Sequence, residues 1–252
     1  MPLWPDFPTP IVFAHRGASA HAPENTLAAF ALAAQQGAEA IELDAKLSAD
    51  GHVVVIHDAT VDRTTDGHGS VAALPLAALR KLEAGSFFSE KFRGEHIPTL
   101  DEVFETVGKR LFINIELTNY VTPSDGLVEK VGEAVNRHNM GERVLLSSFF
   151  PGNLSKAAHL LPEVPRGLLA WRGWLGVWGR SFGFAFGAYR ALHPHIADTS
   201  PQQVQRVHRL RRCIHVWTAN DETSIRRLHG WGVDGVFTDN PQLAVRVLGR
   251  RK

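Results

Sequence analysis

Side chains that can transfer protons or bind a cation follow apolar, strand-like segments near the start of the sequence. His15 ends the run IVFAH and is followed by Arg16. Glu42 and Asp44 lie two residues apart in AIELDAKL, and because side chains alternate along a strand, both carboxylates point to one face. His57 ends the run VVVIH. Two histidines near two carboxylates could move protons beside a bound cation.

A short hairpin is predicted to return His57 to these carboxylates. Asp50-Gly51 between two strand-like runs is typical of a two-residue β-hairpin turn. In that register Asp44 lies directly opposite His57 on the same face, with Cβ atoms about 5 Å apart. A loop of a different length would shift this pairing and every contact that depends on it.

A third carboxylate, Glu116, lies near the end of the segment LFINIEL. Alternation places it on the face opposite the apolar side chains of Ile113 and Ile115. Three converging carboxylates without a cysteine form an oxygen-rich site, which suits Mg²⁺ or Ca²⁺ better than zinc. The histidines supply an acid and a base, and Arg16 can pair with an anionic oxygen. This combination indicates chemistry at phosphoryl oxygens.

The elements that must position these residues alternate between strand and helix. Nine segments have the character of strands: 11–15, 40–47, 53–57, 111–117, 143–148, 166–170, 191–195, 213–218 and 234–239. Residues 53–57 follow a short turn and cannot run parallel to their predecessor. The other eight predict an α/β TIM (β/α)8 barrel, a single domain over 1–252, with an extra hairpin arm and a small insertion at about 58–99.

In such a barrel, active sites lie at the carboxyl ends of the strands. The residues that fall at those ends are His15, Glu42, Asp44, Glu116 and Trp217, and the hairpin adds His57. A doubly wound open sheet is the alternative, but no glycine-rich phosphate fingerprint follows a strand. The formal net charge of +1 indicates no nucleic-acid partner. One cysteine excludes an internal disulfide. The N-terminal residues lack a signal-peptide pattern, and no apolar run reaches the ~20 residues of a membrane span, so we expect a cytoplasmic protein.

The motifs together resemble one known family. HRG followed by PENT, then ELD, VVIHD and IEL, are similar to the motifs of glycerophosphodiester phosphodiesterases. Supporting segments are VDRTTDGHG, IPTLDEVF, LLSSF, VWTAN and GVDGVFTDNP, so the resemblance covers roughly residues 10–242. It implies a metal-dependent TIM barrel of lipid and glycerol metabolism. Such an enzyme hydrolyses glycerophosphodiesters to glycerol 3-phosphate and an alcohol.

The resemblance also implies roles for individual residues. His15 and His57 would be the catalytic acid-base pair, in an order that the sequence leaves open. The ligands of the divalent cation, Mg²⁺ or Ca²⁺, would be Glu42, Asp44 and Glu116.

Three further positions would contact the substrate, a small glycerophosphodiester. Arg16 would contact the phosphate, and Trp217 would form a wall on the glycerol side. Thr118 departs from the family, which usually has a lysine at this place on the same strand face as Glu116. Thr118 would point toward the site without a charge, so that Arg16 or the cation would carry more of the phosphate binding.

Other interpretations remain open. The substrate could be a lysophospholipid or another phospholipid headgroup, or the barrel could bind phosphate esters without catalysis, which only Thr118 favours. The aromatic stretch 171–189 predicts either a helix whose aromatic side covers the barrel or an exposed lip that contacts lipid. Glu24-Asn25 could cap a helix or support His15, and Asp239-Asn240 is predicted to cap the last helix.

Overall fold

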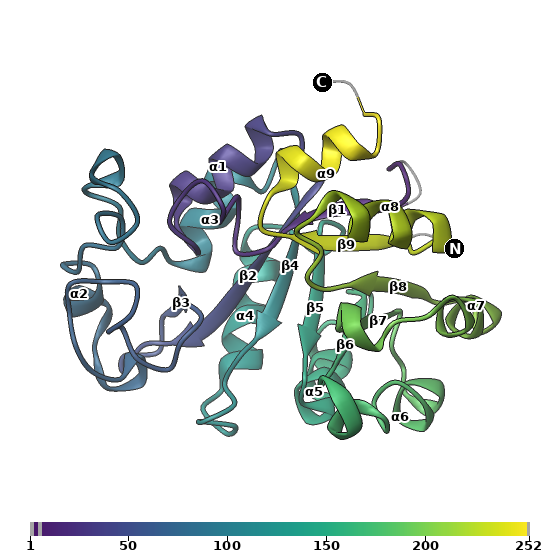
Figure 1. The fold of residues 1–252 in the computed structure, drawn as a ribbon. Coiled ribbons are helices and arrows are strands. Elements are labelled where there is room, and N and C mark those ends of the chain that lie inside the picture. Colours follow the sequence, from purple (N-terminus) through teal and green to yellow (C-terminus); the bar gives the residue numbers. More distant parts are fainter. Residues whose placement is uncertain (1–2, 5–6, 251–252) are drawn as a thin grey trace.

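The computed structural model describes residues 3, 4 and 7–250, and its centre is a closed ring of eight parallel strands (Figure 1). The ring closes because β1 pairs with both β2 and β9. Its strands are β1 (Ile11–Ala14), β2 (Ala40–Leu47), β4 (Phe112–Leu117), β5 (Val144–Ser148), β6 (Arg166–Ala170), β7 (Ala191–Pro194), β8 (Cys213–Val216) and β9 (Gly235–Thr238). The predicted TIM barrel is confirmed.

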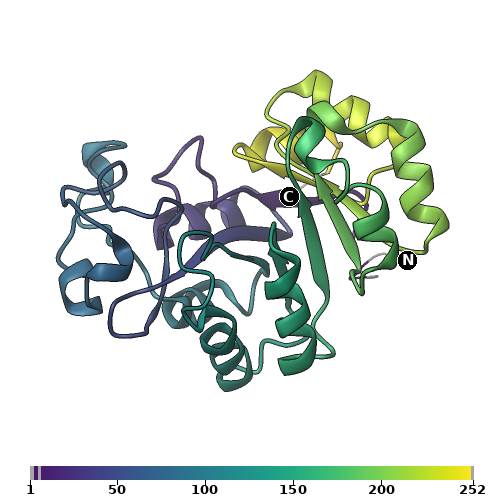
Figure 2. The ribbon, with the colours of Figure 1, turned by 90° about the horizontal axis from the view of Figure 1, so that it is seen from below.

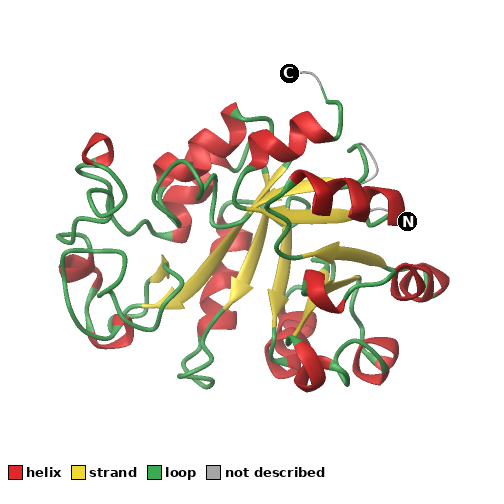
Figure 3. Ribbon diagram, in the orientation of Figure 1, coloured by secondary structure: helices red, strands yellow, loops and turns green. Residues whose placement is uncertain are grey.

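Helices cover the outside of the ring, as the red ribbons around the yellow strands show (Figure 3). Outward side chains such as Ile113 and Ile115 are fully buried beneath them. The longer helices are α1 (Leu27–Gln35), α3 (Leu100–Val107), α4 (Leu127–Arg137), α5 (Pro151–Leu160), α7 (Pro201–Arg209), α8 (Glu222–Trp231) and α9 (Pro241–Val247). The shorter ones are α2 (Leu76–Leu79) and α6 (Phe182–Phe186), with 3-10 turns η1 (Val71–Ala73), η2 (Glu90–Phe92), η3 (Gly173–Gly176) and η4 (Ile196–Asp198).

The arm β3 (Val53–Val55) pairs antiparallel with β2 outside the ring, as predicted, but in a different register. The loop contains three residues, 49–51, and Gly51 takes the left-handed φ of +79° that such a loop uses. The backbone N–H of Ile56, rather than that of His57, therefore donates to the Asp44 carbonyl, at 3.0 Å. The predicted direct pairing of Asp44 with His57 is wrong by one residue.

The insertion 58–99 lies outside the barrel and forms its own small apolar cluster around Val61, Val71 and Leu79. It projects on the side of the molecule away from α6 (Figures 1 and 2). No helix in the described part of the chain is long and apolar enough to cross a membrane.

The aromatic stretch after β6 does not form the continuous helix that its tryptophan spacing predicted. Only the short η3 and α6 are helical there. Glycines interrupt the segment, and Gly173 takes a left-handed φ of +70°. Because most of the aromatic side chains in this stretch are exposed, the prediction of a helix whose aromatic side covers the barrel is wrong.

Candidate functional site

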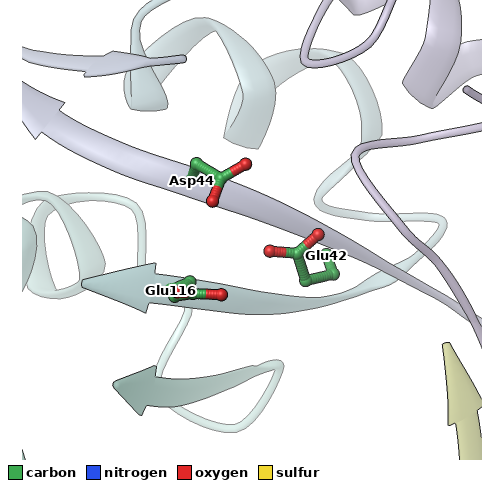
Figure 4. Close-up of side chains that lie close together, drawn as sticks. All are labelled: Glu42, Asp44 and Glu116. Atoms are coloured by element: carbon green, nitrogen blue, oxygen red, sulfur yellow. The ribbon is translucent and has the colours of Figure 1, made fainter. Parts of the chain in front are cut away.

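Three carboxylates meet at the carboxyl ends of β2 and β4. Glu42 and Asp44 share the inner face of β2, and the parallel register pairs Asp44 with Glu116 of β4. The carboxylates turn toward one another (Figure 4), and one oxygen from each lies within 4.8 Å of the others. Alternation along β2 and the β2–β4 register together produce this cluster.

The three carboxyl groups lie close together and away from water, so their like negative charges repel one another. Burial, and then the charges of Asp44 and Glu116, raise the pKa of Glu42 well above its usual value. Burial and Asp44 raise the pKa of Glu116 to about 8. Burial also acts to raise the pKa of Asp44, but the charge of Arg16 and then of His57 outweighs it and holds that pKa below its usual value.

The cluster fits a divalent cation. Glu42 is 3% exposed, and its Oε1 atom has no hydrogen-bond partner among the described residues. A buried, unpartnered carboxylate oxygen beside two further carboxylates is costly unless a cation compensates it. Because every donor in the cluster is a carboxylate oxygen, the set suits Mg²⁺ or Ca²⁺.

Two residues in left-handed backbone conformations hold the cluster from the adjoining loop. Arg16 has φ +56° and Asn25 has φ +57°, values that are uncommon outside glycine. The Arg16 backbone N–H donates to Glu42 at 3.0 Å, and its Nε lies 3.4 Å from the Asp44 carboxylate. The Asn25 amide donates to Asp44 at 2.8 Å. Thr26 caps α1, so Asn25 supports a carboxylate rather than the helix or His15.

Each histidine is oriented by an aspartate. His15 Nδ1 donates to Asp239 at 2.7 Å, and His57 Nδ1 donates to Asp58 at 2.6 Å. When Nδ1 carries the proton, Nε2 is the ring nitrogen left for the cavity that both histidines line. Although the hairpin register is shifted, the chain beyond β3 still brings His57 to the carboxylates.

Ion pairs connect this arrangement around the cavity. Arg63, from the insertion, donates to Asp58 at 2.7 Å and to Glu24 at 2.8 Å. Glu24 in turn accepts from Arg16 at 3.0 Å. The hydrogen bond from Arg63 is the largest cause that holds the pKa of Asp58 far below its usual value. The partner of His57 is thus fixed as a carboxylate.

The cavity has a volume of about 270 Å³, and aromatic side chains line it together with the carboxylates. Trp217 lines it, with its indole N–H donating to the His193 carbonyl at 2.8 Å. Phe149 and Trp171 stack at 4.0 Å between ring centroids. The residues around the cavity are His15, Arg16, Glu42, His57, Asn114, Glu116, Phe149, Leu169, Trp171, Arg172, Trp217 and Phe237.

Several site residues were missed by the sequence reasoning. The pair Asp239-Asn240 was predicted to cap the last helix; Asn240 does cap α9, whereas Asp239 holds His15 instead. The Tyr120 hydroxyl donates to Glu116 at 2.8 Å and accepts from the Phe149 backbone at 3.1 Å. No local sequence pattern indicates the contact of Asp239 with His15 or that of Tyr120 with the Phe149 backbone, because these partners come together only in the folded structure.

Lys46 was also missed, although the alternation of β2 places it on the face of Glu42 and Asp44. Its ammonium donates to the Thr118 carbonyl at 2.9 Å and hydroxyl at 2.8 Å. Thr118 is 4% exposed, and its hydroxyl also donates to the Ala45 carbonyl. Burial lowers the pKa of Lys46, while the charges of Asp44 and Glu116 oppose that effect. Thr118 therefore anchors an amine beside the carboxylates.

A cavity of this chemistry at the carboxyl end of a (β/α)8 barrel defines a hydrolase of phosphate esters. Residues 15–243 match the model of the glycerophosphoryl diester phosphodiesterase family. The chain belongs to this family and is an enzyme of the phosphodiesterase class. The non-catalytic alternative is thereby set aside.

Individual relatives agree with this assignment. A glycerophosphodiester phosphodiesterase of Caldanaerobacter subterraneus subsp. tengcongensis is 41% identical over 239 residues, which are 94% of this chain and 97% of that protein. The structure of an Oleispira antarctica phosphodiesterase in complex with the product sn-glycerol-3-phosphate has a TM-score of 0.87 and 34% identity, over 95% of this chain and 97% of that one. The glycerophosphodiester phosphodiesterase of Agrobacterium tumefaciens has a TM-score of 0.82 and 31% identity, over 94% and 99% of the two chains.

Proposed function

We propose that this enzyme hydrolyses small glycerophosphodiesters to glycerol 3-phosphate and an alcohol, with a divalent cation and the pair His15 and His57 as acid and base. One observation carries the proposal: two histidines, each oriented by its own aspartate, line the same cavity as Glu42 and Glu116, two of the three clustered carboxylates. The glycerol 3-phosphate named as product in the Oleispira antarctica structure supports the substrate class.

Glu42, Asp44 and Glu116 would hold the cation. When bound, the cation supplies neutralisation of negative charge on the non-bridging phosphate oxygens. Arg16 adds a guanidinium that lines the same cavity and can pair with a phosphate oxygen. Tyr120 keeps the Glu116 carboxylate oriented through its hydrogen bond.

The histidines would move the two protons of the reaction. One accepts, at Nε2, the proton of the attacking hydroxyl, which is that of water or of the substrate's own glycerol 2-hydroxyl. The other donates a proton to the oxygen of the leaving alcohol as its bond to phosphorus breaks. Attack by water gives glycerol 3-phosphate directly, whereas attack by the 2-hydroxyl gives a cyclic phosphate, which water then opens to glycerol 3-phosphate with the two histidines in exchanged roles. Asp239 and Asp58 hold the imidazoles in the tautomer that this exchange requires.

Alanine variants of the two histidines test this assignment. His15→Ala and His57→Ala should each lower kcat for glycerophosphocholine by about 100-fold or more, the usual scale for a general acid or base. His52→Ala is the matched control, because His52 directly follows the hairpin loop and has a 54% exposed side chain. Wild-type turnover by either site variant would overturn the assignment.

Lysophospholipids are the second candidate substrates, favoured by the stacked Phe149 and Trp171 at the cavity. An acyl chain could pack on these rings, whereas glycerophosphocholine has no such group. Comparing kcat/KM for glycerophosphocholine and lysophosphatidylcholine distinguishes the candidates. A higher value for lysophosphatidylcholine would replace the proposed substrate class but leave the proposed chemistry intact.

A further inference from the structure

Exposed apolar side chains concentrate in one segment of the described chain. Seven of the twelve large apolar side chains that are exposed lie between residues 171 and 186. Trp174 is 82% exposed and Phe186 is 86% exposed. The seven, here called the aromatic band, are Trp171, Trp174, Leu175, Val177, Trp178, Phe182 and Phe186. An apolar surface of this concentration indicates an interaction site.

Ring contacts join the second half of the aromatic band. The ring of Trp178 covers Gly183 so closely that a Cβ there would lie 2.4 Å from the indole. The rings of Phe182 and Phe186 stack at 6.3 Å between centroids. Gly183 therefore allows the indole to pack against α6, whose exposed phenylalanines are Phe182 and Phe186.

A half-buried ion pair holds the band in place. Arg180 lies 3.2 Å from the Asp198 carboxylate. The same guanidinium donates to the carbonyls of Trp171 at 2.6 Å and Gly173 at 2.7 Å. Arg180 thus joins the beginning of the band to η4, and the exposed rings are presented by a fixed backbone rather than by a loose loop.

Several arginines of the described chain form no ion pair and lie just before β7 or along and after α7, on the side of the barrel that carries α6. The Arg212 guanidinium lies 4.9 Å from the ring centroid of Phe184 and donates to its carbonyl, which joins α6 to the end of α7. Both helices lie on the same side of the barrel (Figures 1 and 2). Within residues 3–4 and 7–250, no carboxylate forms an ion pair with Arg190, Arg206, Arg209, Arg211 or Arg212. Residues 164–197 also contain no aspartate or glutamate.

The band begins at the active-site cavity. Trp171 belongs to the band and lines the cavity, and the neighbouring Arg172 lines it as well. A partner bound along the band would therefore lie beside the opening through which substrate enters.

We propose that the aromatic band and its flanking arginines bind the surface of an anionic lipid bilayer. Tryptophan and phenylalanine insert at the headgroup level, and arginines attract anionic headgroups. A nucleic acid would leave the exposed aliphatic side chains of Leu175 and Val177 without a base to stack on. A second copy related by twofold symmetry would bring the same arginines face to face. The proposal is independent of the hydrolytic mechanism.

Vesicle co-sedimentation of the full chain tests the aromatic contribution. We expect wild type to bind phosphatidylcholine vesicles that contain about 30% phosphatidylglycerol, and to bind pure phosphatidylcholine more weakly. The double variant Trp174→Ala/Phe186→Ala should weaken binding about tenfold or more. Phe87→Ala/Phe88→Ala is the matched control, because these phenylalanines are 46% and 38% exposed on the insertion. It should bind as wild type does.

A charge-reversal pair tests the arginines. Arg209→Glu/Arg211→Glu should abolish the preference for anionic vesicles, while Lys109→Glu/Arg110→Glu, an equal charge change on the exposed loop before β4, should preserve it. Hydrolysis of soluble glycerophosphocholine should be unchanged in the aromatic variant, which shows that it is folded. Absence of vesicle binding by wild type, equal loss in the controls, or a dimer that the aromatic variant dissociates would each overturn the proposal.

Discussion

Cation binding should be linked to proton release, and the size of the linkage follows from Glu116. Its pKa of about 8 means that at pH 8 about half of the carboxyls are ionised, and at pH 6 about one in a hundred. A cation must displace that proton, so the apparent Kd for Mg²⁺ should be about 50-fold weaker at pH 6 than at pH 8. Because burial also raises the pKa of Glu42, this factor is a minimum.

Isothermal titration calorimetry measures both quantities. Titrations at pH 6, 7 and 8 give the apparent Kd, and buffers with different ionisation enthalpies give the number of protons released per ion. Glu116→Gln should weaken binding at pH 8 and flatten its pH dependence, because the amide cannot exchange a proton. Glu105→Gln, at an exposed position of α3, is the control and should behave as wild type. An affinity that is constant from pH 6 to 8, or binding without proton release, would refute this reasoning.

Three other predictions concern the support of the site. Lys46→Met removes a cation from beside Asp44, so it should tighten Mg²⁺ binding about threefold to tenfold by calorimetry; Lys46→Arg, which keeps the charge, should change the affinity less. Gly17→Ala should lower the free energy of unfolding in urea by about 2–4 kcal/mol, because Gly17 has φ +86° and the new Cβ would lie 2.7 Å from the Cβ of Ala29. Gly51 also has a left-handed φ, of +79°, but has open space around it, so Gly51→Ala should lower the free energy of unfolding by only about 1 kcal/mol. Burial lowers the pKa of His215 to about 4, so the stabilising effect of this histidine is complete above about pH 6.5 and declines as the pH falls toward 4. Between pH 7 and 4.5, the free energy of unfolding of His215→Gln should therefore fall by about 2.5 kcal/mol less than that of wild type, as measured by urea unfolding. An equal fall in both proteins would contradict the burial argument.

The hairpin illustrates how far local patterns reach. Alternation in the sequence was sufficient to place Glu42 and Asp44 on one strand face and to identify β3 as an antiparallel arm. It could not decide whether the loop held two residues or three, since both lengths fit an Asp-Gly turn. The three-residue loop shifts the register, and His57 reaches the site from beyond the end of the strand instead of from within it.

The aromatic stretch illustrates the reverse case. Trp171, Trp174 and Trp178 have helical spacing. This spacing shows which side chains would share one face if the segment were a helix, but it does not show that the segment is one. Arg180 binds the carbonyls of Trp171 and Gly173 and the Asp198 carboxylate, contacts that favour a folded loop over a helix. Asp198 follows β7, so its carboxylate comes within reach of Arg180 only because β7 lies beside β6 in the barrel.

By itself, the sequence determined which segments alternate as strands or repeat as helices, and it placed the reactive side chains at the carboxyl ends of the strands. Each of these features depends only on neighbours along the chain. Tertiary structure decided the rest. Closure of the barrel brings Asp239 to His15 across 224 residues. The β2–β4 register sets Asp44 beside Glu116 and lets Lys46 reach Thr118. These contacts join separate strands, and no local period encodes the offset between strands that are only brought together by packing.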